Sequence, residues 1–322
     1  MSREILVDVK DVQKYFPLSK GWFKTKSYVR AVDNISFSIN RGETFGLVGE
    51  SGCGKSTTGR LINGLIKADN GEIFFDGKNL LGLPEKKWKK YRQKMQMVFQ
   101  DPFASLSPRM RVKDIVMEPL TIHFPKMSSK EKLERVIELL GKCGIDEFHL
   151  NKFPHEFSGG QRQRISIARA LILQPELIIA DEAVSALDVS IQSQILNLMK
   201  DLQDEYKLTY LFISHDLSVV EHISDRVGVM YLGNLVEVAP KSKTFNDPKH
   251  PYTKSLLSSI PKPDPKLKRK KILLSGEIPS ASNPPSGCKF HTRCPVVMDV
   301  CKKKVPQAVN LGEGHSVACH LY

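Results

Sequence analysis

Short apolar runs and helical patterns alternate along the chain. The runs at residues 44–48, 177–180 and 210–213 have the length of strands, whereas residues 162–173 have the spacing of a helix whose apolar face is formed by Ile165, Ala168, Leu171 and Ile172. The run at 177–180 is apolar without a break, which is typical of a strand buried on both faces of a mainly parallel sheet. The pattern therefore predicts an α/β fold.

Two further regions surround these elements. An antiparallel β region is expected within residues 1–90, because the turn pair Asp76-Gly77 follows an apolar stretch. Residues 101–157 are expected to be mainly helical. One helix there begins at a capping box, residues 128–131, and is expected to end at Gly141. Its apolar face is formed by Leu133, Val136, Ile137 and Leu140.

A complete phosphate-binding loop (P-loop) stands between the first apolar run and helix-compatible residues. Its glycines let the backbone curl so that successive amide N–H groups point into one concavity, and the helix beginning near Lys55 adds the positive end of its dipole. Lys55 is expected to reach the β- and γ-phosphates, and Ser56 to supply a ligand to Mg²⁺. The sequence predicts nucleoside triphosphate binding by Gly49, Glu50, Ser51, Gly52, Cys53, Gly54, Lys55, Ser56 and Thr57.

Two carboxylates, Asp181 and Glu182, follow the apolar run at 177–180. Acidic groups at the carboxyl end of such a strand lie where open α/β sheets bind their ligands. Asp181 is therefore expected to hold Mg²⁺, and Glu182 to polarise the attacking water as a general base. An acidic helix start is the alternative, but the P-loop in the same chain makes it the weaker interpretation.

A third motif, Ser158-Gly159-Gly160-Gln161, immediately precedes the helix at 162–173. Ser158 and Gln161 alone would form an ordinary capping box. A capping box does not require the two glycines, which expose backbone N–H groups at the positive end of a helix. The motif predicts a second phosphate-binding surface.

Composition adds charge and cysteine chemistry to this picture. The net charge of +13 favours an acidic partner, such as a nucleotide, a nucleic acid or anionic lipid. No run of about 18 apolar residues and no apolar signal region is present, so we expect a cytoplasmic protein, in which six cysteines favour metal, cluster or reduced thiols over disulfides. The proline-rich residues 240–272 indicate a connector. Its basic run at 266–271 is interpreted as solvated surface, with lipid contact as an alternative.

Over most of its length the chain resembles the ATP-binding subunits of ABC transporters. Residues 158–161 match the signature motif, which in that family closes over the γ-phosphate held by the P-loop of another subunit. The resemblance therefore implies two ATP molecules between two nucleotide domains. It also implies roles for a Q-loop glutamine near Mg²⁺ and water, a D-loop aspartate, a switch histidine at the γ-phosphate and an aromatic residue on adenine. These are Gln100, Asp188, His215 and Phe16, with Tyr15 as the neighbouring candidate for adenine.

One position departs from the family pattern. Proline usually follows the catalytic glutamate, whereas this chain has Ala183. Because the carboxylate itself is retained, we expect hydrolysis to be retained as well.

The resemblance also implies the architecture. The expected fold class is α/β, with a RecA-like P-loop NTPase core, an antiparallel β subdomain, an inserted helical subdomain and a small cysteine-containing C-terminal extension. The nucleotide-binding domain is expected at residues 1–240, with its helical subdomain at about 101–165, and the extension at 241–322. Residues 101–109 are expected to receive a cytoplasmic helix of a membrane subunit.

The tail narrows the subfamily. Its segments 250–253, 276–280 and 283–288 resemble the C-terminal extension of oligopeptide and dipeptide importer ATPases, most closely those of the F type. The resemblance implies an ATPase at the cytoplasmic face of a bacterial membrane. Its implied partners are a D-type ATPase paralogue in a heterodimer, two transmembrane permeases and, through them, an extracytoplasmic substrate-binding protein. Nickel importers share this architecture and remain an alternative.

Four tail cysteines, Cys288, Cys294, Cys301 and Cys319, offer soft ligands for one metal centre. They lack the paired C-x-x-C spacing of zinc ribbons, and Cys294-Pro295 has the form that ends many cluster motifs. The subfamily resemblance implies a [4Fe–4S] cluster. Zinc and metal-free reduced thiols are the alternatives.

A rival function is that of a soluble ABC ATPase acting on the ribosome or DNA, which the positive charge would suit. Such proteins usually join two nucleotide domains in one chain or insert a long coiled coil. This chain has one P-loop, one signature and no sustained heptads, so no nucleic-acid partner is expected. A regulatory subunit without hydrolysis is disfavoured by Asp181, Glu182 and His215.

Overall fold

The computed structural model describes residues 4–18, 27–260, 272, 274 and 276–322. These form two compact units, one made of the first 82 residues with residues 214–322, the other of residues 83–213. The basic run at 266–271 lies outside the described residues, so its predicted surface role stays a prediction. Among the described residues, no helix combines the length and apolar character needed to cross a membrane.

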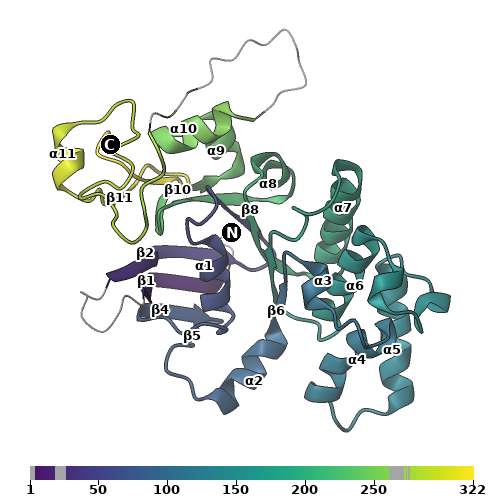
Figure 1. The fold of residues 1–322 in the computed structure, drawn as a ribbon. Coiled ribbons are helices and arrows are strands. Elements are labelled where there is room, and N and C mark those ends of the chain that lie inside the picture. Colours follow the sequence, from purple (N-terminus) through teal and green to yellow (C-terminus); the bar gives the residue numbers. More distant parts are fainter. Residues whose placement is uncertain (1–3, 19–26, 261–271, 273, 275) are drawn as a thin grey trace. The chain divides into compact units, whose positions relative to one another are not determined.

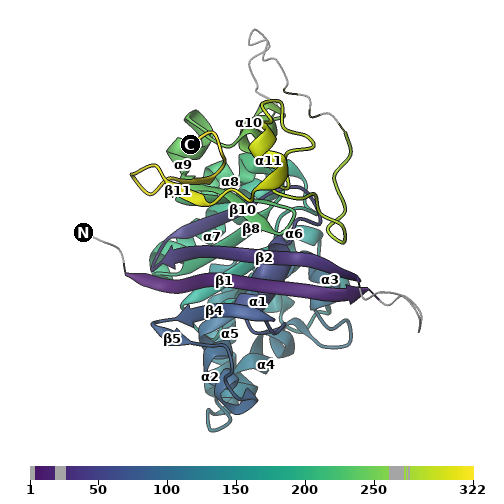
Figure 2. The ribbon, with the colours of Figure 1, turned by 90° about the vertical axis from the view of Figure 1, so that its left-hand side faces the viewer.

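The first unit contains the predicted antiparallel sheet (Figure 2). Its strand order is β2-β1-β4-β5. The hairpin turn at Asp76-Gly77 is confirmed, since both residues have positive φ, as a tight two-residue turn requires. The strands are β1 (Ile5–Leu18), β2 (Ser27–Asn40), β4 (Asn70–Phe75) and β5 (Lys78–Asn79).

A second sheet of the same unit carries the P-loop. β3 (Thr44–Val48) is buried at every residue and pairs in parallel with β9 (Arg226–Tyr231). β9 continues antiparallel to β10 (Asn234–Pro240), and then come β12 (Ser316–Ala318) and β11 (Ala308–Asn310). The helices α1 (Lys55–Ile62) and α8 (Leu217–Ile223) accompany this sheet.

The tail is built onto this sheet from short helices (Figure 1). The first part of the expected connector is folded, because it forms α9 (Lys241–Asn246) and α10 (Pro251–Ser258), and Tyr252 is fully buried. Proline does not oppose this arrangement: Pro251 occupies the first position of α10, where no intrahelical N–H bond is needed. A third tail helix is α11 (Asp299–Lys303).

The second unit has a parallel sheet and a group of helices. β6 (Met95–Val98), β7 (Leu177–Asp181) and β8 (Thr209–Ser214) pair in parallel, and β7 is buried throughout, as its unbroken apolar run predicts. The helices are α2 (Glu85–Lys94), α3 (Pro102–Ser105), α4 (Val112–His123), α5 (Ser129–Lys142), α6 (Gly159–Leu171) and α7 (Val189–Tyr206).

The helix α5 tests two capping predictions. Ser128 caps its start, because its hydroxyl accepts a hydrogen bond of 3.2 Å from the amide of Glu131. The prediction that Gly141 ends the helix is wrong. The helix continues to Lys142, and the residue with positive φ that closes it is Gly144, followed by a bond from Ile145 N–H to Leu140 C=O.

Candidate functional site

The P-loop approaches neighbouring backbone so closely that two of its glycines cannot be replaced. A Cβ on Gly49 would lie 2.1 Å from the carbonyl oxygen of Met230, and one on Gly54 would lie 2.0 Å from that of Ala31. Both glycines have positive φ, a backbone conformation that residues with a side chain rarely adopt. The curl of the loop is therefore imposed by its surroundings as well as by its own sequence.

Lys55 is drawn into the loop that precedes it. Its side chain is buried, and its ammonium donates to the carbonyl oxygens of Gly49 at 2.8 Å and Glu50 at 3.1 Å. α1 begins at this residue, and its N-cap Gly54 supplies no side-chain bond to the first turn. The Lys55 ammonium and the positive end of α1 thus face the same loop, and both attract phosphate oxygens.

The two aromatic candidates for adenine are in different situations. The Tyr15 hydroxyl bonds the carboxylate of Asp33, and burial together with this bond raises the pKa of Tyr15 to about 12. The ring of Phe16 is 36% exposed and lies 5.4 Å from the Lys14 ammonium. Only Phe16 combines an exposed ring with no bond to a buried carboxylate.

The second unit holds the carboxylates. Asp181 is the last residue of β7 and is buried, while Glu182 follows with a φ of +49°, an uncommon conformation for a residue other than glycine. The amide nitrogen of Gln100 donates to a carboxylate oxygen of Glu182 at 3.0 Å. Ala183, where the family has proline, is buried. Sequence positions 82 residues apart are thus brought into contact.

The signature residues start α6 as predicted. Ser158 and Gln161 bond each other's backbone amides at 3.3 and 3.1 Å, which confirms the capping box. A Cβ on Gly160 would lie 2.5 Å from the side chain of Ile191 in α7, whereas one on Gly159 would touch only Leu187 at 3.4 Å. Gly160 therefore has a packing reason that the sequence did not reveal, and Gly159 is the more exposed of the two.

The remaining predicted residues lie at element boundaries. Asp188 caps α7, since its carboxylate accepts from the Ile191 amide at 2.9 Å and from the Ser190 hydroxyl at 2.7 Å, and these bonds lower its pKa. His215 is exposed directly after β8. The P-loop, Phe16 and His215 belong to the first compact unit, and Gln100, Asp181, Glu182, Asp188 and the signature to the second.

A contact that the sequence did not indicate joins the P-loop to the tail. Two nitrogens of the Arg293 guanidinium donate to the two carboxylate oxygens of Glu50, at 2.9 and 3.1 Å. The Tyr252 hydroxyl accepts the Glu50 amide at 3.0 Å. A pairing over 243 residues leaves no local pattern, and an Arg among many basic residues carries no signal of its own.

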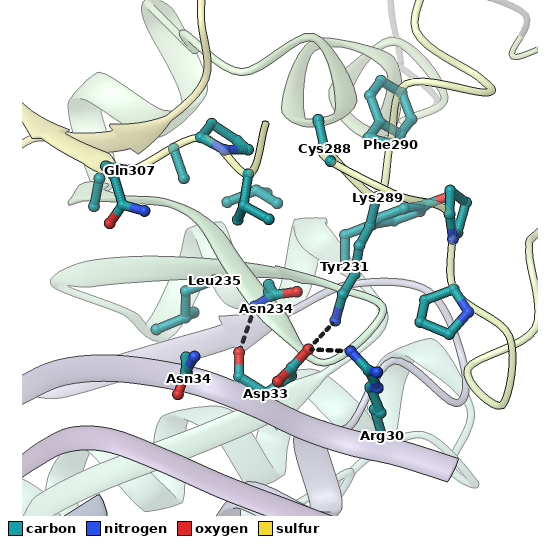
Figure 3. Close-up of a pocket in the computed structure, with 18 of the residues that line it drawn as sticks. Arg30, Asp33, Asn34, Tyr231, Asn234, Leu235, Cys288, Lys289, Phe290 and Gln307 are labelled. Atoms are coloured by element: carbon teal, nitrogen blue, oxygen red, sulfur yellow. Dashed lines mark hydrogen bonds and ion pairs between the residues drawn. The ribbon is translucent and has the colours of Figure 1, made fainter. Parts of the chain in front are cut away.

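The same tail segment reaches the β1–β2 sheet at a pocket of about 890 Å³ (Figure 3). There the ammonium of Lys289 lies 2.8 Å from a carboxylate oxygen of Asp33, and Arg30 approaches the same carboxylate at 3.9 Å. Burial would raise the pKa of Asp33, but the hydrogen bonds from Lys289 and Tyr15 outweigh it and lower that pKa. Asp33 is thus an ionised anchor for the tail.

The four tail cysteines line one small pocket, together with His291 and His320. All four are free thiols. Burial, with a smaller contribution from the three other thiols, raises the pKa of Cys288 to about 11. In the described part of the chain, no group of three or more His, Cys, Asp or Glu side chains has the arrangement that holds a metal ion.

Comparison with known proteins identifies the cassette. The family model described as "ABC transporter" matches residues 32–185, and the model described as "Oligopeptide/dipeptide transporter, C-terminal region" matches residues 236–301. The Bacillus subtilis oligopeptide transport ATP-binding protein AppF is 54% identical, with 100% of this chain and 98% of that protein covered. The chain belongs to the ABC transporter ATP-binding family. The predicted membership is therefore confirmed.

Two other relatives support this assignment. The Escherichia coli oligopeptide transport ATP-binding protein OppF is 50% identical over 98% of this chain and 96% of its own length. The solved structure titled "Dimeric structure of a post-hydrolysis state of the ATP-binding cassette MJ0796 bound to ADP and Pi" has a TM-score of 0.65 and 31% identity, covering 73% of this chain and 99% of that chain. The predicted α/β P-loop fold and ATPase class are confirmed.

Proposed function

We propose that this chain binds and hydrolyses ATP to drive a membrane importer of oligopeptides or dipeptides. One observation carries the proposal: an ABC cassette and an oligopeptide/dipeptide C-terminal region occur in one chain, and peptide-transport ATPases align with it from end to end. The nucleotide-binding domain spans residues 1–240, with its helical subdomain at about 101–165, and the extension spans 241–322.

The catalytic roles follow from side-chain chemistry. Lys55 would contact the β- and γ-phosphates. Ser56, Gln100 and Asp181 would hold Mg²⁺ directly or through water, an all-oxygen donor set that suits this ion, and the ion would neutralise phosphate charge. Glu182 accepts the proton of the attacking water. The 3.0 Å bond from Gln100 supports this role, because it fixes the carboxylate that must receive the proton.

The other predicted residues contact the adenine ring or the γ-phosphate of ATP. Phe16 stacks on adenine, a choice favoured by its exposed ring and by the commitment of Tyr15 to Asp33. His215 stabilises charge at the γ-phosphate. Ser158, Gly159, Gly160 and Gln161 bind the γ-phosphate of the ATP held by a second ATPase subunit, and Asp188 lies in the loop between the two sites.

The working assembly is a pair of ATPase subunits. A dimer is described for the cassette MJ0796, and the proposed partner here is a D-type paralogue. Closure around two ATP molecules would move two transmembrane permeases, which receive substrate from an extracytoplasmic binding protein. Phe103, 60% exposed with the Arg162 guanidinium 3.5 Å from its ring, offers an apolar contact for a permease helix at residues 101–109. The chain itself would bind peripherally at the cytoplasmic face of a bacterial membrane.

For the tail we propose a [4Fe–4S] cluster on Cys288, Cys294, Cys301 and Cys319. Four free thiols around one pocket provide the required donor set. The four thiolates would hold the cluster as its sulfur ligands. The cluster would hold together a tail whose own apolar core is small.

Purification from native membranes tests the importer proposal. Gentle extraction of the tagged chain should recover two multi-spanning permeases and a second ATPase, and the reconstituted complex should take up peptide only with ATP. A complex carrying Lys55→Ala is the matched control and should lack uptake. Uptake of nickel in place of peptide would select the nickel alternative. Recovery with ribosomes or DNA, without membrane subunits, would overturn the proposal.

A further inference from the structure

Glu50 is the only acidic residue of the P-loop, and every polar group it has is engaged. Its amide donates to the Tyr252 hydroxyl, its carbonyl accepts from the Lys55 ammonium, and its carboxylate accepts two bonds from Arg293. Two of these three contacts come from the tail. Through its carbonyl, Glu50 is bonded to Lys55, the lysine that is proposed to bind phosphate.

The Arg293–Glu50 pair is shielded from solvent. Arg293 is 8% exposed and the Glu50 side chain 23%. Its bidentate geometry is the arrangement in which a guanidinium fixes both the position and the orientation of a carboxylate. A guanidinium stays charged throughout the pH range in which proteins are folded. An exposed ion pair could be lost without consequence, but a shielded one with two bonds holds its partner in place.

Arg293 is itself held rigidly by the segment 288–294. Phe290 in this segment is fully buried, with its ring 5.2 Å from that of Tyr231 and 5.4 Å from that of Tyr252. The amide of Arg293 donates to the Phe290 carbonyl at 3.0 Å. The segment begins and ends with Cys288 and Cys294, two of the thiols that line the cysteine pocket.

Charge explains why the ATP site needs this arginine. A triphosphate brings several negative charges to the P-loop, and an unpaired carboxylate in the same loop would repel them, strongly because it is shielded from water. Arg293 neutralises the Glu50 carboxylate and holds the side chain of the residue whose carbonyl accepts from Lys55.

From these contacts we propose that Arg293 is a positioning residue of the ATP site, which acts through Glu50 to orient the P-loop and to cancel its negative charge. It touches no phosphate. The proposal rests on the proposed function, since it requires that the P-loop binds ATP.

ATP affinity of the purified full-length chain tests this role. Arg293→Gln should weaken binding of a fluorescent ATP analogue with Mg²⁺ by about tenfold or more, while the turnover of the assembled complex at saturating ATP should change little. Glu50→Gln combined with Arg293→Gln should restore part of the affinity, because the uncancelled carboxylate is gone although the two bonds that orient the loop remain absent. Lys243→Gln, which removes an exposed tail ion pair with Glu313, is the matched control and should bind like the wild type.

The outcomes separate a positioning role from a structural one. If Arg293 only stabilised the tail, the double variant would bind as weakly as Arg293→Gln or more weakly, and the proposal would be wrong. It would also be wrong if folded Arg293→Gln bound ATP normally. If that variant does not fold, Arg293→Lys decides on orientation: lysine keeps the charge that cancels Glu50 but can make only one bond to it, so wild-type affinity would overturn the positioning role. A wild-type chain that does not bind ATP, or unchanged binding in Lys55→Ala, would count against the proposed function itself.

Discussion

At the scale of single residues, the contact between Gln100 and Glu182 assigns different tasks to two adjacent carboxylates. Asp181 ends β7 and is buried, whereas Glu182 turns away with positive φ and receives the Gln100 amide. A change of residue 182 to an amide keeps its shape and removes its basicity. That substitution therefore isolates proton transfer from nucleotide binding.

Glu182→Gln should lower the rate of ATP hydrolysis by about 100-fold or more while ATP still binds, since general-base catalysis contributes about this much. Phosphate release and retention of bound ATP measure the two effects. Glu176→Gln is the matched control: it makes the same substitution just before β7, where the carboxylate pairs with Lys94. Hydrolysis near the wild-type rate in Glu182→Gln would show that Glu182 is not the general base.

Single residues also mark the limit of what the sequence predicts. Lys55, Ser158 and Gln161 are recognised because their spacing encodes a local structure, a loop or a cap, which the chain forms wherever it lies. Arg293 and Lys289 act through Glu50 and Asp33, more than 240 residues away. Such pairs depend on the folded tail, so composition and periodicity could not identify them.

At the scale of elements, α5 and α6 begin with the same type of serine cap. In each, the serine hydroxyl accepts the amide of the third helical residue, at 3.2 Å for Ser128 and 3.3 Å for Ser158. Only Ser158 belongs to the proposed signature. A comparison of the two serines can therefore distinguish the contribution of a cap to stability from a role in ATP binding.

Ser128→Ala and Ser158→Ala should each lower the free energy of unfolding by about 1 kcal/mol, the usual contribution of an N-cap. Only Ser158→Ala should also lower ATP hydrolysis by the assembled complex, because its hydroxyl is proposed to reach the partner's γ-phosphate. Urea unfolding and hydrolysis assays measure the two effects. Equal hydrolysis in both variants would reduce Ser158 to a helix cap.

The start of α10 makes the tail sensitive to acid. His250 is fully buried, its ring nitrogen accepts the Tyr252 amide at 3.1 Å, and burial lowers its pKa to about 3. In the unfolded chain a histidine has a pKa of about 6.5. Between these values the unfolded state binds more protons, so the free energy of unfolding falls as the pH decreases below about 6.5.

We predict that the wild type loses about 1 kcal/mol of unfolding free energy on this account between pH 7.5 and 5.5. His250→Asn can still accept the Tyr252 amide as an N-cap but cannot titrate, so its loss over the same range should be smaller by about that amount. Urea unfolding at both pH values gives the comparison. Equal losses of unfolding free energy in the two proteins would show that His250 binds a proton as readily in the folded state as in the unfolded chain.

At the scale of the whole molecule, predictability follows the distance over which contacts act. The β–P-loop–α1 unit, the apolar strand β7 and the α6 cap are local, and the sequence predicted each of them. The helices α9 and α10 were interpreted as part of a connector, because their prolines suggested a break. Burial of Tyr252 against Tyr231 and Phe290, from three separated segments, stabilises what local propensity did not indicate.

The same reasoning applies to the tail cysteines, which come together from positions 288, 294, 301 and 319. If they hold a [4Fe–4S] cluster, Cys301→Ala should abolish iron content and visible absorbance in anaerobically purified protein, and should lower the unfolding midpoint. Cys143→Ala also replaces a buried thiol, one that lies outside the cysteine pocket, and should keep both signals. Zinc in place of iron would select the zinc alternative, and a metal-free wild type would select reduced thiols.

Because Arg293 directly precedes Cys294, loss of the cluster should weaken ATP binding in Cys301→Ala as well. Unchanged ATP binding in this variant would show that the P-loop is positioned independently of the thiols.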